Sequence, residues 1–316
     1  MKWMLPVLLA LAISGVAAQP SEQVENPAPT VGPGSKGEGV LRAQVLLDRR
    51  SFSPGEIDGA YGPNLRAALR GFQAAYNLPV SDVLTAEAWA VLNRDTAPVM
   101  TTYEISEEDV AGPFEMIPED MMQKSKLRVL GYSSALELLA EKFHVNPAVL
   151  KTLNEGKSFD RSGEKILVPN VVPTTQDTRK AATVVVRRSD MTVSALDDTG
   201  NVIAQFPASV GSEHDPLPVG KWKIEGVARN PKFHYNPKLF WDAEASHSKA
   251  TIAAGPNNPV GVVWIELSKP HYGIHGTPEP GRVGHTQSHG CIRLTNWDAL
   301  RLATMVSPGT PADLRE

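Results

Sequence analysis

The stretch GIHGTPEPGRVGHTQSHGCIRL, residues 273–294, holds the only cysteine of a 316-residue chain and three of its eight histidines. Cys291 follows Gly290 directly, and Arg293 lies two residues further on, so an extended segment would place the thiol and the guanidinium on one face. A single cysteine cannot form a disulfide within the chain. The thiol is therefore either a reactive group or a small buried hydrophobe, and its neighbours must decide between the two.

The neighbours of Cys291 suit acyl transfer at an amide carbonyl. A nearby imidazole or backbone N–H group lowers the pKa of a thiol and makes the thiolate available. The amides around Gly290 could face a developing oxyanion, and Arg293 could bind a carboxylate through two hydrogen bonds. Spacing alone leaves two candidates for the base: His289, which shares a face with Cys291 in an extended segment, and His275, from the preceding strand.

The run IHGTPEPGRVGHTQSHGCIRLTNWDAL resembles the catalytic domain of L,D-transpeptidases, which carries His-Gly, about a dozen further residues, and then Ser-His-Gly-Cys-x-Arg. DPLPVGKWKI and GPNNPVGVVWIELS are similar to strands of the same family, so the resemblance spans most of residues 182–314. It implies a mostly-β sandwich domain over residues 182–316, with the cysteine loop at one end of a sheet.

The resemblance also implies a role for each residue of the motif. Cys291 would be the nucleophile, and His275 the general base that later acts as the acid. His289 would shape the site, and the backbone at Gly290 would bind the oxyanion.

Three further positions would support these groups. Ser288 would hold the cysteine loop, and Arg293 would lie at the wall of the substrate site. Some family members orient the upstream histidine with a serine that follows it, but this chain has Gly276 there. A backbone carbonyl at Gly276 would have to orient His275 instead.

The implied reaction acts on peptidoglycan stem peptides and needs no cofactor. The thiolate attacks the carbonyl between the third residue of a tetrapeptide, a diamino acid, and its terminal D-alanine. The acyl group then passes to an amine of another stem peptide or of a wall-anchored lipoprotein. Water as the acceptor would make the protein an L,D-carboxypeptidase.

Two alternatives to this reaction remain open at the level of sequence. His271 and His275, like His285 and His289, have the spacing of metal ligands, but glycines interrupt both segments and we expect no metal. A peptidoglycan-binding scaffold without catalysis is the second alternative, although it gives no reason for Cys291 to lie beside these histidines.

The N-terminus, MKWMLPVLLALAISGVAAQP, has the features of a secretory signal peptide over residues 1–18. We therefore expect export, to the periplasm, and no membrane association after cleavage. No cysteine lies near the cut, which argues against a lipid anchor. Residues 19–37 are rich in Pro, Gly and polar residues and predict a flexible linker. The net charge of −4 gives no basic field for nucleic acid.

Residues 38–95 predict a small helical bundle. Apolar side chains at helical spacing form one face of a helix that Pro63 would begin, and Thr85 would cap a third helix. The signature Asp58-Gly59, Tyr61-Gly62-Pro63 and the helix that follows resemble the small helical peptidoglycan-binding domain.

Residues 100–172 predict an α+β unit. Ser134 and Glu137 form a capping box, Asn146-Pro147 begins a second helix, and ILVPNV is a strand. The order resembles a lysin-motif domain, in which residues 101–105 would supply the first strand. The whole chain is therefore predicted to be multidomain.

Other residues receive structural predictions. We expect His144 and the acidic run at 106–110 to be solvated, Trp264 to lie in the core, His214 and Asp215 to have a loop role, and His247 not to touch the substrate. The aromatic stretch FHYNPKLFW, residues 233–241, would either line the substrate groove or pack beneath a loop.

Overall fold

The computed structural model describes residues 30–173, 178–288 and 290–316. The expected signal peptide and most of the expected linker lie outside these residues. The chain is already packed at Val31, which is buried and pairs with Leu84, so the expected linker ends earlier than residue 37. Among the described residues, no helix has both the length and the apolar character needed to cross a bilayer.

The helical unit (residues 31–95) contains α1 (Glu38–Arg49), α2 (Pro63–Ala75) and α3 (Ala86–Leu92). Pro63 opens α2, and the Thr85 side chain accepts a hydrogen bond from the backbone N–H of Ala88, as the sequence predicts. The apolar face of α2 lies in the core of the unit. Its buried residues include Leu65, Ala68, Leu69 and Phe72.

The middle unit (residues 100–172) has a strand–helix–helix–strand frame. β1 (Met100–Glu104) pairs antiparallel with β2 (Lys165–Pro169), and α6 (Ala135–Lys142) and α7 (Pro147–Leu153) lie between them in the chain. Ser134 and Asn146 cap the two helices. Between β1 and α6 the chain forms α4 (Glu107–Val110) and an inserted segment, residues 111–133, that contains α5 (Met121–Lys124).

The prediction of solvated residues in the middle unit fails at Asp109 and His144, whereas Glu107 and Glu108 of the acidic run are exposed as expected. Asp109 is buried and bonds Tyr103, Ser106 and Lys142; burial raises its pKa, but these partners outweigh burial and hold the pKa at about 2. His144 bonds the Asp48 carboxylate at 3.1 Å and stacks on Trp297, with ring centroids 4.9 Å apart. These partners come from distant parts of the chain, which local polarity does not reveal.

The β unit (residues 181–316) carries a nine-stranded mixed sheet within the described residues, in the order β5-β4-β3-β13-β7-β10-β11-β12-β6. One helix, α8 (Asn296–Met305), follows the cysteine segment. The strands are β3 (Thr183–Arg187), β4 (Thr192–Leu196), β5 (Val202–Pro207), β6 (Ser209–Val210), β7 (Gly220–Arg229), β10 (Val263–Leu267), β11 (Gly273–His275), β12 (Ile292–Arg293) and β13 (Pro311–Arg315).

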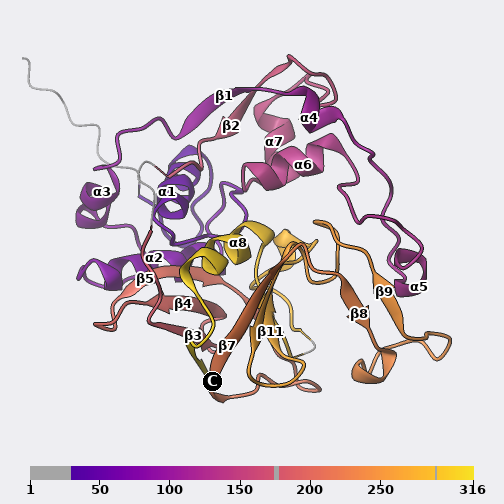
Figure 1. Cartoon of the computed structure of the whole chain (residues 1–316). Helices are drawn as coiled ribbons and strands as arrows, with labels where there is room; N and C mark the ends of the chain where they lie inside the picture. Colours follow the sequence, from indigo (N-terminus) through magenta and orange to yellow (C-terminus); the bar gives the residue numbers. More distant parts are fainter. Residues whose placement is uncertain (1–29, 174–177, 289) are drawn as a thin grey trace, which may run out of the picture.

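Both halves of this sheet contribute to one apolar core. Side chains of β3, β4 and β5 pack in the same cluster as those of β7, β10, β11 and α8. The sheet therefore curls around its core, and the mostly-β fold predicted for this part of the chain is confirmed (Figure 1). A separate hairpin, β8 (Phe233–Tyr235) with β9 (Ala250–Ile252), extends beside α5.

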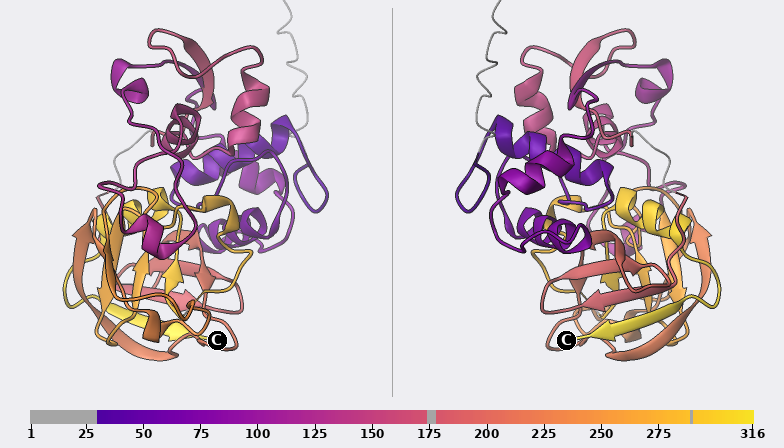
Figure 2. Two further views of the ribbon diagram at one scale, coloured as in Figure 1. Left: turned by 90° about the vertical axis from the view of Figure 1, so that its right-hand side faces the viewer. Right: turned by 90° about the vertical axis from the view of Figure 1, so that its left-hand side faces the viewer.

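The helical and middle units lie together over the α8 side of the β unit (Figures 1 and 2). Ser53 of the helical unit donates a hydrogen bond to Asp298 of α8 at 2.8 Å. Ile57 of the helical unit forms an isolated β-bridge with Val145, and its side chain packs into the core of the middle unit. The three units thus form a continuous packed body around α8.

Candidate active site

Strand pairing brings the two motif segments together. β11 and β12 are parallel, with Ile274 opposite Ile292 and His275 opposite Arg293. Because Cys291 immediately precedes β12, this register places it beside Gly273 at the start of β11. The approach of Cys291 to the His275 strand is therefore set by the sheet itself.

The Cys291 thiol is half-buried, and its Sγ lies 3.8 Å from the carbonyl oxygen of His271. Burial raises the pKa of the thiol, while the backbone N–H of Gly273 and the charge of Arg293 lower it without outweighing burial. The Gly273 N–H and Arg293 thus act on the thiol pKa in the expected direction, but burial makes the net effect in the structure an increase. A proton acceptor is needed to form the thiolate at neutral pH.

His275 is buried and neutral. Its Nδ1 lies 2.6 Å from the carbonyl oxygen of Gly276, and since that oxygen only accepts, Nδ1 carries the proton and Nε2 is left with its lone pair. The ring stacks on Trp264, with centroids 5.5 Å apart and planes at 19°. Burial and the charge of Arg293 lower the pKa of His275 to about 4. Nε2 is therefore available as a proton acceptor at neutral pH.

Gly290 and Ser288 shape the cysteine loop. Gly290 has φ +90°, and a Cβ on it would lie 2.9 Å from the Tyr272 ring, so both conformation and space favour glycine. The Ser288 hydroxyl donates to the carbonyl oxygen of Cys291, and its N–H donates to that of Gly211 at 3.0 Å. His289, a candidate from the sequence, lies outside the described residues.

Arg293 is half-buried beside this loop. Its charge acts on Cys291 and His275, and it interacts electrostatically with Glu279 and Asp242. The carboxylate of Asp215 also acts on the thiol, raising its pKa. The charges of Arg293 and Asp215 thus act on the thiol pKa in opposite directions.

Sequence reasoning missed the part that Trp264 plays. The strand Val263–Leu267 alternates, with Val263, Ile265 and Leu267 buried and Trp264 only half-buried. The expected core position is therefore wrong, because Trp264 lies on the opposite face and stacks on His275. The alternation in VVWIEL could have revealed this.

Most of the aromatic stretch is packed, and the prediction that it lines the substrate groove stays a prediction. Phe233, Tyr235 and Phe240 pack around Leu130 of the inserted segment, whereas Trp241 is 61% exposed and contacts the His214 ring at 4.5 Å. His247 is held between Tyr235 and Asp120, at 2.9 and 2.8 Å.

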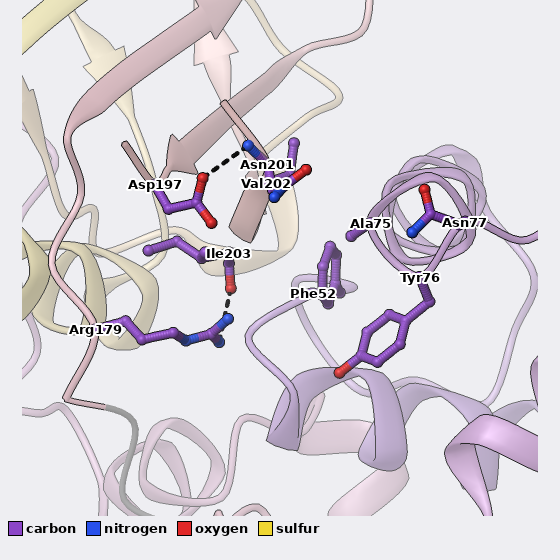
Figure 3. A pocket seen from close by; sticks show the side chains of 9 residues that line it. All are labelled: Phe52, Ala75, Tyr76, Asn77, Arg179, Asp197, Asn201, Val202 and Ile203. Atoms are coloured by element: carbon purple, nitrogen blue, oxygen red, sulfur yellow. Dashed lines mark hydrogen bonds between the residues drawn. The ribbon is translucent and has the colours of Figure 1, made fainter. Parts of the chain in front are cut away.

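Among the described residues, the histidines considered as metal ligands from the sequence belong to no group close enough to hold a metal ion. Within residues 30–173, 178–288 and 290–316, the His, Cys, Asp and Glu side chains that group closely enough for a metal ion are Asp120, Glu244 and His247, between α5 and the β8–β9 hairpin. A hollow of about 250 Å³ lies elsewhere, between the end of α2 and β5 (Figure 3). Phe52, Tyr76 and Arg179 are among its lining residues, and Cys291 is not.

Comparisons with known proteins identify the family of the chain. Residues 181–314 match the family profile of the L,D-transpeptidase catalytic domain, and residues 36–92 match that of a peptidoglycan binding domain. The YkuD protein of Bacillus licheniformis, named as an L,D-transpeptidase, is 30% identical over 178 residues, which cover 55% of this chain and 90% of that protein.

The chain belongs to the L,D-transpeptidase family. It is similar to YbiS of Escherichia coli, which is also named as an L,D-transpeptidase, with 25% identity over 235 residues and 72% of each chain covered. A solved L,D-transpeptidase from Mycobacterium smegmatis has 23% sequence identity and a TM-score of 0.35, covering 48% of this chain and 66% of that one. The chain is thus an enzyme of the L,D-transpeptidase type that carries an N-terminal peptidoglycan-binding domain, and peptidoglycan is its substrate.

Proposed function

We propose that the chain is an exported cysteine L,D-transpeptidase in which Cys291 is the nucleophile and His275 the general base. The observation that carries this proposal is the neutral, buried His275, whose Nδ1–H is held by the Gly276 carbonyl on the strand paired with the cysteine segment.

The first half-reaction forms a thioester. As Sγ attacks the carbonyl carbon of the third residue of a tetrapeptide, the thiol proton passes to Nε2 of His275. The negative charge on the carbonyl oxygen is received by the backbone N–H groups around Gly290. When the intermediate collapses, the amine of D-alanine leaves with the proton from His275.

The second half-reaction reverses these transfers. An acceptor amine attacks the thioester, His275 takes one of its protons, and the Cys291 sulfur leaves and regains a proton. The acceptor is an amine of a stem peptide or of a wall-anchored lipoprotein. Arg293 and Ser288 contribute to substrate binding, and His289 shapes the loop.

The N-terminal units serve to bind the wall. The helical unit does so as a peptidoglycan-binding domain. The middle unit acts as a lysin-motif domain, a proposal supported by its antiparallel β1–β2 pair and the two capped helices between them. Export, by the signal peptide of residues 1–18, is consistent with a substrate that lies outside the cytoplasm.

The test is the release of D-alanine from tetrapeptide muropeptides by the full chain. We expect release with wild type, none with Cys291→Ala, and a rate lower by about a hundredfold or more with His275→Ala. A cross-linked product indicates an amine acceptor, whereas a tripeptide alone indicates the L,D-carboxypeptidase. Release by Cys291→Ala at the wild-type rate would refute the proposal.

A further inference from the structure

We infer that Asn296 and Glu141 are positioning residues for His275, so that a side chain of the middle unit sets the geometry of the general base. This inference rests on the proposed role of His275. It concerns a chain of contacts that runs from α6 through the first residue of α8 to the peptide that orients the imidazole.

The Asn296 side chain is buried and fixed in both position and orientation. Its Nδ2 donates to both carboxylate oxygens of Glu141, each at 3.1 Å, and to the carbonyl oxygen of Pro256 at 3.2 Å. Its Oδ1 accepts the backbone N–H of Val262 at 3.1 Å. Because acceptors surround the nitrogen and a donor faces the oxygen, the amide has one satisfied orientation.

The Asn296 amide oxygen lies against Gly276. A Cβ on Gly276 would be 2.1 Å from Oδ1, so no side chain fits there while Asn296 keeps its place. The N–H of Gly276 donates to the carbonyl oxygen of Val263 at 3.2 Å, and its own carbonyl accepts from His275. The glycine whose carbonyl orients the imidazole is thus bonded to β10 through its N–H and packed against Asn296.

This packing accounts for the glycine after the motif histidine. Gly276 does not have a positive φ, so space rather than backbone conformation excludes a larger residue. The Asn296 amide occupies the volume that a serine side chain would need. Orientation of His275 by a backbone carbonyl and the presence of Asn296 are therefore two parts of one arrangement.

Glu141 holds Asn296 from the middle unit. Its carboxylate accepts from the Tyr132 hydroxyl at 2.8 Å as well as from Asn296. Burial raises the pKa of Glu141 to about 7 although both hydrogen bonds lower it, and the nearby charge of Glu137 raises it further. The desolvation of this carboxylate is offset only while Asn296 and Tyr132 keep their places.

Glu137, one turn earlier on α6, provides a matched control. Its carboxylate accepts from Asn257 Nδ2 at 2.7 Å, so it also joins the middle unit to the β unit. No hydrogen bond of Glu137 involves Asn296. Loss of Glu137 should loosen the same interface without releasing the amide that lies on Gly276.

The experiment measures acylation of the full chain by a carbapenem at pH 7 and alkylation of Cys291 by iodoacetamide at pH 10. At pH 10 hydroxide can take the thiol proton without a protein base, so the alkylation rate reports whether the sulfur is as accessible as in wild type. We expect Glu141→Ala and Asn296→Ala to be acylated about ten- to a hundredfold more slowly than wild type, with near wild-type alkylation. Glu141→Gln retains a hydrogen-bond acceptor, so its acylation rate should fall less. The acylation rate of Glu137→Ala should stay near that of wild type.

The outcomes separate this inference from the proposed function. If His275→Ala is acylated at the wild-type rate, the proposed function itself fails. If His275→Ala is slow but Glu141→Ala is acylated normally, only the positioning role is overturned. Equal losses in Glu137→Ala and Glu141→Ala, or slow acylation together with alkylation faster than in wild type, would also overturn it, because they would indicate general loosening of the fold.

Discussion

This enzyme should keep far more of its activity in acid than an enzyme whose general base is a solvated histidine. His275 has a pKa of about 4 because burial and the Arg293 charge disfavour the imidazolium, whereas a solvated histidine titrates near 6.5. At pH 5 about nine-tenths of His275 is then neutral, against about 3% of a solvated histidine, a difference of about thirtyfold. The Cys291 thiol, whose pKa is raised, stays protonated between pH 5 and pH 7 and so causes no further fall of the rate in acid.

The assay is the rate of carbapenem acylation from pH 4.5 to 8, with circular dichroism at each pH to confirm that the protein stays folded. We expect the rate at pH 5 to lie within about twofold of the rate at pH 7. Glu141, whose pKa is about 7, titrates in the same interval, so the profile is repeated in Glu141→Gln, which cannot titrate. A fall of tenfold or more between pH 7 and pH 5, with a midpoint near 6.5 in both proteins, would refute the assignment of a buried neutral base.

Three further changes test the packing and the charges around the site. Burial and the Asp48 charge raise the pKa of Asp298 to about 7, so the contribution of this carboxyl to the free energy of unfolding is retained below about pH 4 and lost as the pH rises through 7. Asp298→Asn should therefore stabilise the protein at pH 8 by up to about 4 kcal/mol and have little effect at pH 4, as urea titrations would measure. Leu130→Ala removes a fully buried side chain between the inserted segment and the β8–β9 hairpin, so it should lower the free energy of unfolding by about 2–5 kcal/mol in the same titrations. The control Val129→Ala changes an exposed position and should alter that free energy by no more than about 0.5 kcal/mol. Because the guanidinium lowers the thiol pKa, Arg293→Gln should shift the pH profile of iodoacetamide alkylation to higher pH and leave the rate at its high-pH plateau unchanged; equal slowing at every pH would instead indicate blocked access.

Local signals in the sequence predicted most of the elements that position the site. The apolar stripe of α2 and the caps at Thr85, Ser134 and Asn146 occur as expected, although the Glu137 carboxylate bonds Ser133 and not the Ser134 backbone that a capping box requires. Each depends on side chains within a few residues of one another, so spacing alone is informative.

Contacts between distant segments were not predictable in this way. His144 and Asp48 are 96 residues apart, and Glu141 and Asn296 are 155 residues apart, so neither pair has a local signature. The burial that raises the thiol pKa also results from tertiary packing. The glycine at 276 was visible in the sequence as a departure from the family pattern, but its cause, the amide of Asn296, is visible only in the structure.

The most direct test of the catalytic account is the intact mass of the full chain after incubation with a carbapenem, compared between wild type and Cys291→Ala. One covalent adduct on wild type and none on the variant is the predicted result. An adduct of the same mass on Cys291→Ala, or no adduct on folded wild-type protein, would contradict the assignment of the Cys291 sulfur as the acyl acceptor.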